Sequence, residues 1–299
     1  ISTGTELLIY RGEAPRDLPA DETLDALEGD LSFPLRYGYA AVGEVVDVGQ
    51  EADEEWLGRT VMAFNPHETA FSASPDAVVP IPEALEPEAL ALYPTVETAS
   101  SLVLDGRPRV DERVVVFGAG VVGLSTTALL SRFPLSDLVV VDPIASRREL
   151  ALELGADAVA TPERLSISRW DDAPGPDGAD LIYELSGQPA ALDDAVGIAG
   201  YDSRVLVGSW YGTKSATLDL GGDFHRDRVT IESSQVSTID PDHRGRYSFD
   251  RRTEMALDAL ETFPVDSLIT HHVPFEEAPR AYRLLNERPE DALQVLLTY

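Results

Sequence analysis

Residues 113–142 carry the pattern that most restricts the fold of this chain: a strand, a glycine-rich turn, a helix and a second strand follow without interruption. The first strand is RVVVF, the turn is GAGVVG at 118–123, and the second strand, DLVVV, ends directly before Asp142. Three glycines at this spacing permit a tight turn, a close approach of the backbone to a pyrophosphate, and close packing of helix on strand. An acid about 20 residues further on can accept hydrogen bonds from an adenosine ribose. The pattern therefore predicts a dinucleotide site in a parallel α/β sheet.

The cofactor contacts expected from this pattern lie at the start of the helix and after the second strand. The helix N-terminus presents free amides and the positive end of its dipole to phosphates. Asp142 would repel a phosphate on the ribose, so NAD(H) is favoured, while Arg147 on the following helix leaves NADP(H) open. The predicted contacts are Gly118, Gly120, Val121, Val122, Gly123, Asp142 and Arg147.

The chain divides into three segments of different character. Residues 1–98 are β-rich, with short strand-like runs such as GRTVMAF and DAVVPIP closed by turn residues. Residues 99–264 alternate six strand-like runs with helical runs, which is typical of a doubly wound parallel sheet. Residues 265–299 read as strand, helix and strand, and we expect them to rejoin the first domain. The predicted organisation is a catalytic domain, a nucleotide domain and a C-terminal return.

Composition excludes several classes of function. The 299 residues include 53 acidic and 23 basic residues, a net charge of −30 at pH 7, and no cysteine. Disulfides, thiolate nucleophiles and sulfur-containing zinc sites are therefore excluded. Nucleic acid and anionic membranes would repel such a charge, and no apolar run is long enough to span a membrane. Carboxylate-rich surfaces are typical of salt-loving organisms, so we expect a halophilic, cytoplasmic protein that acts on a small molecule.

Segments from both ends of the chain carry a resemblance to a known superfamily. STGTE, FPLRYGYAAVGEVVDVG, GRTVMAF, VFGAGVVGL and LITHHVPFEEAPRAYRLL resemble the medium-chain dehydrogenase/reductases, the group of the zinc alcohol dehydrogenases. The resemblance is greatest to the branch of threonine dehydrogenase-like proteins and bacteriochlorophyllide dehydrogenases. It implies a GroES-like β-rich catalytic domain plus a Rossmann domain, an active site in the cleft between them, and a homodimer or homotetramer formed near RVTIESSQV. Since Ile1 falls inside a motif, we also expect a preceding segment of the first domain.

The same resemblance identifies the family's zinc-ligand positions. They are occupied by Thr3, Tyr39 and Pro94, and the cysteine-rich lobe that binds structural zinc in many relatives is missing. Threonine and tyrosine are poor substitutes for thiolate or imidazole, and a proline side chain cannot coordinate a metal. We therefore expect hydride transfer without zinc.

Without a metal, hydrogen-bond donors must stabilise the charge that develops on the substrate oxygen. Thr5 matches the family's hydroxyl relay, although it also reads as an ordinary strand or turn hydroxyl. Tyr39 can donate its phenol or simply fill the emptied metal position. Asn65 and His67 can orient a substrate or exchange a proton, and His67 reads equally well as an exposed loop residue. The resemblance adds two cofactor contacts, Thr98 and Ser186.

The sequence thus predicts an NAD(P)-dependent oxidoreductase that moves a hydride between nicotinamide and a carbonyl, an alcohol or an activated double bond. A quinone or enone reductase is one alternative, because hydrogen bonds alone can hold a developing enolate. A non-catalytic NAD(H)-binding sensor or subunit is another, because the metal ligands are lost. Glu6 and Glu97 are candidate pocket acids, but they are interpreted as surface or structural acids, since acidic residues are so common in this chain.

Overall fold

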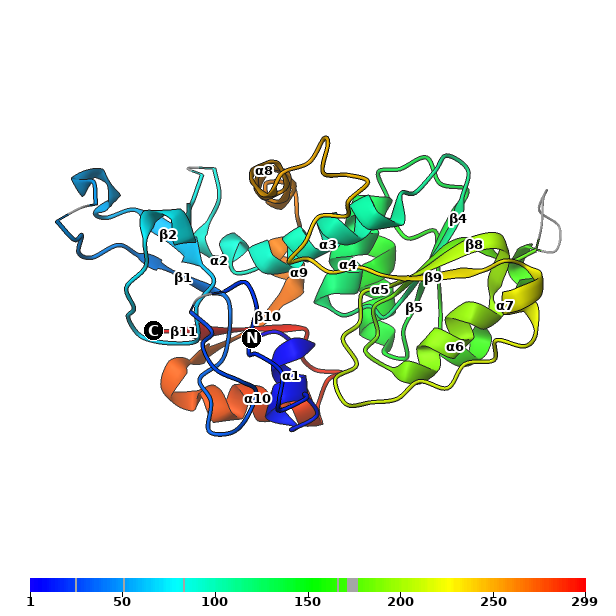
Figure 1. Ribbon diagram of the computed structural model, residues 1–299, viewed down its shortest axis with the longest axis horizontal. Coiled ribbons are helices and arrows are strands. Elements are labelled where there is room, and N and C mark those ends of the chain that lie inside the picture. The colour runs from blue at the N-terminus through cyan, green and yellow to red at the C-terminus, as the bar shows by residue number, and fades with distance from the viewer. Residues whose placement is uncertain (25, 51, 83, 166, 171–176) are drawn as a thin grey trace. The chain divides into compact units, whose positions relative to one another are not determined.

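The computed structural model describes residues 1–24, 26–50, 52–82, 84–165, 167–170 and 177–299 (Figure 1). The chain divides into two compact units, each described here by itself. Unit 1 contains residues 1–94 and 256–299, and unit 2 contains residues 95–255. Among the described residues, no helix is both long enough and apolar enough to cross a membrane.

Unit 2 is built on a six-stranded sheet in which every neighbouring pair is parallel. The strand order is β6-β5-β4-β7-β8-β9. The order proceeds from β4 through β5 to β6 on one side and through β7 to β9 on the other, so the switch point lies between β4 and β7. Ligands of such sheets bind outside the carboxyl ends of the strands at this point. The predicted doubly wound sheet is confirmed, and its strands are β4 (Arg113–Phe117), β5 (Asp137–Val141), β6 (Ala158–Ala160), β7 (Ala179–Glu184), β8 (Ala199–Val207) and β9 (Thr230–Ser233).

Helices pack on this sheet and bury its strands. β4 is buried at every residue, as expected for a parallel strand covered on both faces, and this explains its continuous apolar run. α4 contacts β4 and β5, α5 contacts β5 and β6, and α6 contacts β7 and β8. The helical elements are α3 (Tyr93–Gly106), α4 (Val121–Leu130), α5 (Ala145–Glu153), η3 (Pro162–Arg164), η4 (Ile167–Trp170), α6 (Pro189–Gly197), α7 (Asp223–Arg226) and α8 (Phe249–Leu260), of which α3 and α8 cross the unit boundaries.

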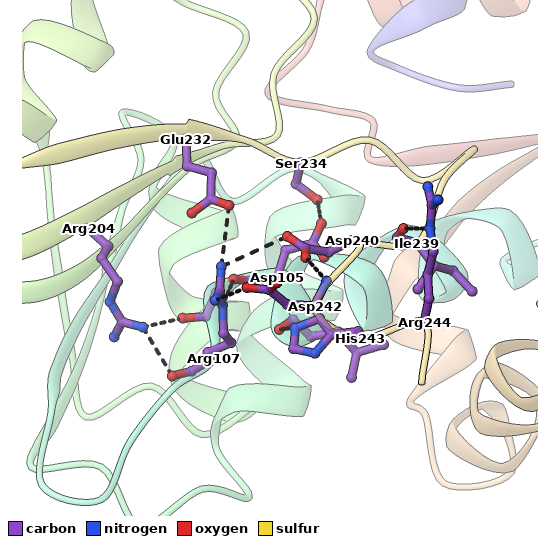
Figure 2. A network of polar contacts seen from close by, with 12 residues as sticks. Asp105, Arg107, Arg204, Glu232, Ser234, Ile239, Asp240, Asp242, His243 and Arg244 are labelled. Atoms are coloured by element: carbon purple, nitrogen blue, oxygen red, sulfur yellow. Dashed lines mark hydrogen bonds and ion pairs between the residues drawn. The ribbon is translucent and has the colours of Figure 1, made fainter. Parts of the chain in front are cut away.

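The segment after β9 is tied to the C-terminal end of α3 by polar contacts (Figure 2). Ser234 donates from its hydroxyl to Asp105 Oδ2 at 2.6 Å, and His243 Nε2 lies 2.9 Å from the carbonyl oxygen of Leu104. Arg107, whose φ of 51° is left-handed, pairs with three acids of the sheet edge and this segment: Glu232, Asp240 and Asp242. Hydrogen bonds and charge pairs therefore tie residues 232–243 to the end of α3 within unit 2.

Unit 1 contains a three-stranded antiparallel sheet, β1-β2-β3, and a two-stranded parallel sheet of β10 and β11. An apolar cluster joins residues from both ends of the chain, among them Ile1, Leu7, Ala281 and Val295. The elements are α1 (Thr5–Tyr10), β1 (Ala41–Glu44), η1 (Glu54–Trp56), β2 (Thr60–Ala63), η2 (Pro75–Ala77), β3 (Val78–Pro80), α2 (Pro87–Leu90), α9 (Val265–Leu268), β10 (Ile269–Pro274), η5 (Phe275–Glu277), α10 (Ala278–Glu287) and β11 (Gln294–Thr298).

Thr5 does not lie in a strand or turn, because it is the first residue of helix α1. The four residues after it, Glu6 to Ile9, are all buried. Leu7 packs in the cluster with α10 and β11, whereas Ile9 packs in a second cluster with Leu27 and Leu31. Leu7 and Ile9 are two residues apart but are buried in different clusters. This indicates a helix, since residues two apart in a strand point to the same face.

Candidate functional site

The glycine-rich turn of unit 2 follows β4 and leads into α4. Gly118 has a φ of +94°, and a Cβ there would meet backbone atoms of Leu185 and Ser186 at 2.7–2.8 Å. A Cβ on Gly123 would lie 1.8 Å from the carbonyl oxygen of Gly118. Gly120 is different: it caps α4, and a Cβ built on it meets nothing within 4 Å. Two glycines are therefore required by the packing of the protein, while the third leaves open space at a helix N-terminus, where a pyrophosphate fits.

Asp142 is fixed beside this turn. Its side chain is buried, Oδ2 accepts a hydrogen bond from the Ala119 amide at 2.8 Å, and Oδ1 accepts one from the Ile144 amide at 2.8 Å. A carboxylate oxygen has two acceptor positions, so each oxygen retains one for a ribose hydroxyl. The structure thus brings Asp142 and the turn together, as the dinucleotide pattern requires.

Four further predicted cofactor residues of unit 2 lie on three helices, α3, α4 and α5. Arg147 lies half-buried on α5; burial lowers its pKa, and the charge of Asp142 acts against this. Arg148, its neighbour, donates from Nη1 to the Asp142 carbonyl at 2.6 Å. Val121 is buried and Val122 is partly exposed, both in the first turn of α4, and Thr98 is a partly exposed residue of α3.

A buried acid at the end of β7 organises the loop that contains Ser186. Glu184 is fully buried; its Oε1 accepts the Ser186 amide at 2.8 Å and contacts the Ser186 hydroxyl, and its Oε2 accepts the Tyr211 hydroxyl at 2.5 Å. Burial and the contact with Glu184 raise the pKa of Tyr211, which keeps this phenol a neutral donor. Sequence reasoning missed Glu184, although a charged residue directly after the apolar run LIY was a usable signal.

Unit 1 holds a second polar group, which we name the Glu6–His67 cluster: Glu6, His67 and Tyr282. Glu6 Oε2 lies 2.9 Å from His67 Nε2 and accepts the Tyr282 hydroxyl at 2.5 Å, while Oε1 accepts the Ser2 amide at 2.7 Å. Burial alone would raise the pKa of Glu6, but the hydrogen bond with His67 and nearby positive charge outweigh it and lower the pKa to about 2. Glu6 is therefore an ionised buried carboxylate, and the interpretation of it as a surface acid is wrong.

His67 is held against a glycine rather than exposed in a loop. Its side chain is 12% exposed, and its backbone amide donates to the Tyr37 carbonyl at 3.2 Å. Gly38 has a φ of +109°, and a Cβ there would lie 2.6 Å from the imidazole ring. The missing side chain of Gly38 is what makes room for the ring.

The other catalytic candidates fall into two sets. The phenol of Tyr39 hydrogen-bonds with the side chains of Ser2 and Thr5; burial and the charge of Glu6 raise its pKa to about 12. The structure therefore brings Thr5 and Tyr39 together as neutral hydroxyls. The amide of Asn65 is used within its own loop, donating to the Pro66 carbonyl at 2.8 Å and to Glu68 at 3.2 Å.

The family's zinc-ligand positions offer poor donors for zinc. Thr3 presents a neutral hydroxyl, Tyr39 presents a phenol that is protonated at neutral pH, and Pro94 presents no donor at all. Within the described parts of the chain, no group of three or more His, Cys, Asp or Glu residues could hold a metal ion. The donor set at these positions does not fit zinc.

The low pKa of Glu6 predicts a stability difference that depends on pH. The pKa falls from 4.5 to about 2 in the folded protein, so the stabilisation is complete above the unfolded value and is lost as the pH falls through the folded value. The shift corresponds to at most about 3 kcal/mol. We expect Glu6→Gln to lower the free energy of unfolding near neutral pH by about that amount, and to differ little from the wild type near about pH 2.

Urea unfolding across this pH range measures the effect. Glu88→Gln is the matched control, because Glu88 also pairs with a histidine, His272 at 3.1 Å, but on the surface, with side chains 46% and 56% exposed for His272 and Glu88. A difference between Glu6→Gln and the wild type that does not change with pH would contradict the prediction.

Comparison with known proteins finds dehydrogenases among the proteins that are similar to this chain. Residues 121–248 match the sequence profile of the family described as zinc-binding dehydrogenase. D-guloside 3-dehydrogenase of Escherichia coli (strain K12) is 26% identical over 99% of this chain and 89% of its own length. Sorbitol dehydrogenase 2 of Saccharomyces cerevisiae is 28% identical over 84% of this chain and 78% of its own length.

Solved structures show the same fold. 2R,3R-butanediol dehydrogenase from Bacillus subtilis superposes with a TM-score of 0.76 at 18% identity, covering 100% of this chain and 89% of that one. A short chain alcohol dehydrogenase from E. coli CFT073, complexed with cofactor NADH, gives a TM-score of 0.70 at 19% identity, covering 86% and 82%. The GroES-like plus Rossmann fold is thereby confirmed. In sequence the chain is thus similar to proteins of the zinc-binding dehydrogenase family, and in fold it is similar to solved alcohol and butanediol dehydrogenases.

Proposed function

We propose that this protein is an NAD(P)-dependent oxidoreductase that interconverts an alcohol and a carbonyl without catalytic zinc. One observation carries the proposal: open space above Gly120, at the N-terminus of α4 and beside the fixed carboxylate of Asp142. The named relatives are dehydrogenases, and one structure of the same fold was solved with NADH. The unsuitable donors at Thr3, Tyr39 and Pro94 support the absence of zinc.

The residues of unit 2 fit a dinucleotide. When bound, the nicotinamide nucleotide supplies or accepts the hydride. The amides of residues 119–123 would hold the pyrophosphate, Asp142 would accept the ribose hydroxyls, and Ser186 would be positioned by Glu184. Arg147 supplies a cation close to Asp142, so NADP(H) stays possible alongside NAD(H).

The relatives support a substrate class. Guloside, sorbitol and butanediol each contain secondary hydroxyls, and these are the compounds for which the relatives and the neighbouring structure are named. We propose a secondary alcohol of a polyhydroxylated small molecule as the substrate. Thr5 and Tyr39 would bind its oxygen as neutral hydrogen-bond donors.

The cellular setting is part of the same proposal. A net charge of −30 supports a halophilic protein that works in the cytoplasm on a small molecule, with neither nucleic acid nor membrane as partner. β9 is an edge strand of the unit 2 sheet, and an unpaired edge supports a homodimer or homotetramer.

Titration of NADH and NADPH in molar KCl, with metal content measured on the same sample, tests the proposal. We expect micromolar binding of NADH, weaker binding of NADPH, and no stoichiometric zinc. NAD⁺-dependent oxidation of D-sorbitol and (2R,3R)-butane-2,3-diol should then be measurable. Stoichiometric zinc would contradict zinc independence. Nucleotide binding without turnover of any alcohol, enone or quinone would favour the non-catalytic sensor, and turnover of enones or quinones alone would favour the reductase.

A further inference from the structure

The hydrogen-bond pattern around Glu6 decides which nitrogen of His67 carries a proton. An ionised carboxylate can only accept, and Glu6 Oε2 faces both His67 Nε2 at 2.9 Å and the Tyr282 hydroxyl at 2.5 Å. Burial raises the pKa of Tyr282, so this phenol donates its proton. His67 Nε2 must therefore carry a hydrogen, and in the neutral ring Nδ1 is the acceptor.

The ring is fixed, and its other nitrogen is available. Gly38 packs against the ring from one side, and Glu6 holds the Nε2 edge. Within the described parts of the chain, no hydrogen bond is made to His67 Nδ1, and 12% of the side chain is exposed. A carboxylate that holds one imidazole nitrogen and leaves the other free is the arrangement of a general base.

The residues that hold this base are chain neighbours of the predicted oxygen-binding hydroxyls. Thr5 directly precedes Glu6, and Tyr39 directly follows Gly38, the residue packed on the ring. The Thr5 and Tyr39 side chains are themselves hydrogen-bonded to each other. The two residues that hold the imidazole, Glu6 and Gly38, and the two neutral donors thus come from the same helix start and the same loop.

The phenols near Glu6 and His67 are protonated and so cannot accept the substrate proton. Burial raises the pKa of each nearby phenol, so these tyrosines stay neutral. The charged groups are Glu6, and Glu68 with its partner Arg36. The phenols are those of Tyr37, Tyr39, Tyr282 and Tyr299.

We propose that Nδ1 of His67 is the proton acceptor of the oxidation, with Glu6 and Tyr282 as positioning residues; the inference rests on the proposed function. The substrate C–H bond breaks, and its electron pair leaves with the hydrogen as hydride to the oxidised nicotinamide. The O–H bond breaks, its proton bonds to Nδ1, and the carbon–oxygen double bond forms. The imidazolium, stabilised by the Glu6 carboxylate, then releases the proton to solvent. The substrate loses two electrons, and the nicotinamide gains them.

Steady-state oxidation of D-sorbitol and (2R,3R)-butane-2,3-diol by NAD⁺ tests the inference in the full chain. We expect His67→Gln to lower kcat by about 100-fold or more while NADH affinity stays unchanged, because general base catalysis is worth roughly that factor. Glu6→Gln should lower kcat less than His67→Gln does and should let the neutral ring adopt both tautomers, since a side-chain amide can donate as well as accept. Tyr282→Phe should lower kcat less than Glu6→Gln and should keep Nε2 protonated.

Two matched control variants change the exposed pair of His272 and Glu88, which has the same residue types as the buried pair of His67 and Glu6. His272→Gln and Glu88→Gln should leave kcat within about twofold of the wild type, because their pair lies exposed. Nitrogen-15 NMR of His67 adds a readout that needs no turnover and does not depend on the stability of Glu6→Gln. We expect Nε2 protonated and Nδ1 unprotonated in the neutral ring.

The outcomes distinguish failure of the proton role of His67 from failure of the proposed oxidoreductase function. A His67→Gln variant that keeps kcat within about threefold of the wild type would overturn the proton role and leave the oxidoreductase proposal intact. A ring protonated on Nδ1 would do the same. Wild-type protein that binds NADH but oxidises neither alcohol would count against the proposed function itself and would remove the reaction on which the inference rests.

Discussion

Gly123→Ala is expected to abolish detectable binding of NADH. The added Cβ would lie 1.8 Å from the carbonyl oxygen and 2.9 Å from the carbonyl carbon of Gly118. These are backbone atoms, so no rotamer change can relieve the overlap, and the turn must open. We expect the free energy of unfolding to fall by about 1–3 kcal/mol, as for other overpacked sites, and the amides at the start of α4 to lose their alignment. Fluorescence titration and urea unfolding measure the two effects.

Gly120→Ala separates nucleotide binding from folding. A Cβ at Gly120 meets nothing within 4 Å, and its φ of −72° suits any residue. We therefore expect stability within about 0.5 kcal/mol of the wild type but NADH affinity reduced by about tenfold or more, because the methyl occupies the space where the pyrophosphate approaches. Gly197→Ala, at the end of α6 and also in open space, should change neither quantity. Normal NADH affinity in both Gly120→Ala and Gly123→Ala would contradict the proposed cofactor site.

Arg252→Met is expected to produce the largest loss of stability. The side chain of Arg252 is buried and donates to Glu97 Oε1 from Nη2 at 3.1 Å and from Nε at 3.3 Å. It also donates from Nη1 to Ser101 Oγ at 3.2 Å and to the Thr238 carbonyl at 3.3 Å. Removing the cation that faces a buried carboxylate typically costs about 3–5 kcal/mol. Urea unfolding in molar KCl should show this loss.

A double variant and a surface control test whether the loss of stability in Arg252→Met comes from the unpaired charge of Glu97. Glu97→Gln combined with Arg252→Met should be less destabilised than the sum of the single variants, because the buried charge is removed together with its partner. Arg228→Met breaks a pair with Asp202 in which the side chains are 69% and 67% exposed, so it should cost less than about 1 kcal/mol. If Arg252→Met cost no more than Arg228→Met, the pair with Glu97 would not stabilise unit 2.

The nucleotide unit could be predicted from the sequence because its signals are local. The glycine turn, α4, β5 and Asp142 follow one another within 113–142, and each strand of the parallel sheet is a short apolar run. Neighbouring pairs such as β4 and β5 are also neighbours in the chain. Local periodicity therefore contained most of the information that the fold of unit 2 required.

The polar clusters could not be predicted in the same way, because their partners are distant in sequence. Glu6 meets His67 across 61 positions and Tyr282 across 276, and nothing near Glu6 distinguishes it from the other acids among the 53 acidic residues. The helical conformation of Thr5 is not evident locally, because one side of α1 packs against α10 and β11, which come much later in the chain, and the other against Leu27 and Leu31. Glu97 was read as a surface or structural acid; its pairing with Arg252 is structural and buried.

The division of unit 1 into two stretches sets an order of events during synthesis. Unit 2 is one uninterrupted stretch, so all of its strands have been made once residue 255 has left the ribosome. Glu6 is made before unit 2, whereas Tyr282, in helix α10, is made after it. Domains of nascent chains generally fold as units as they emerge. The nucleotide fold can therefore form before Tyr282 is made, and the Glu6–His67 cluster is completed only after unit 2 has been synthesised.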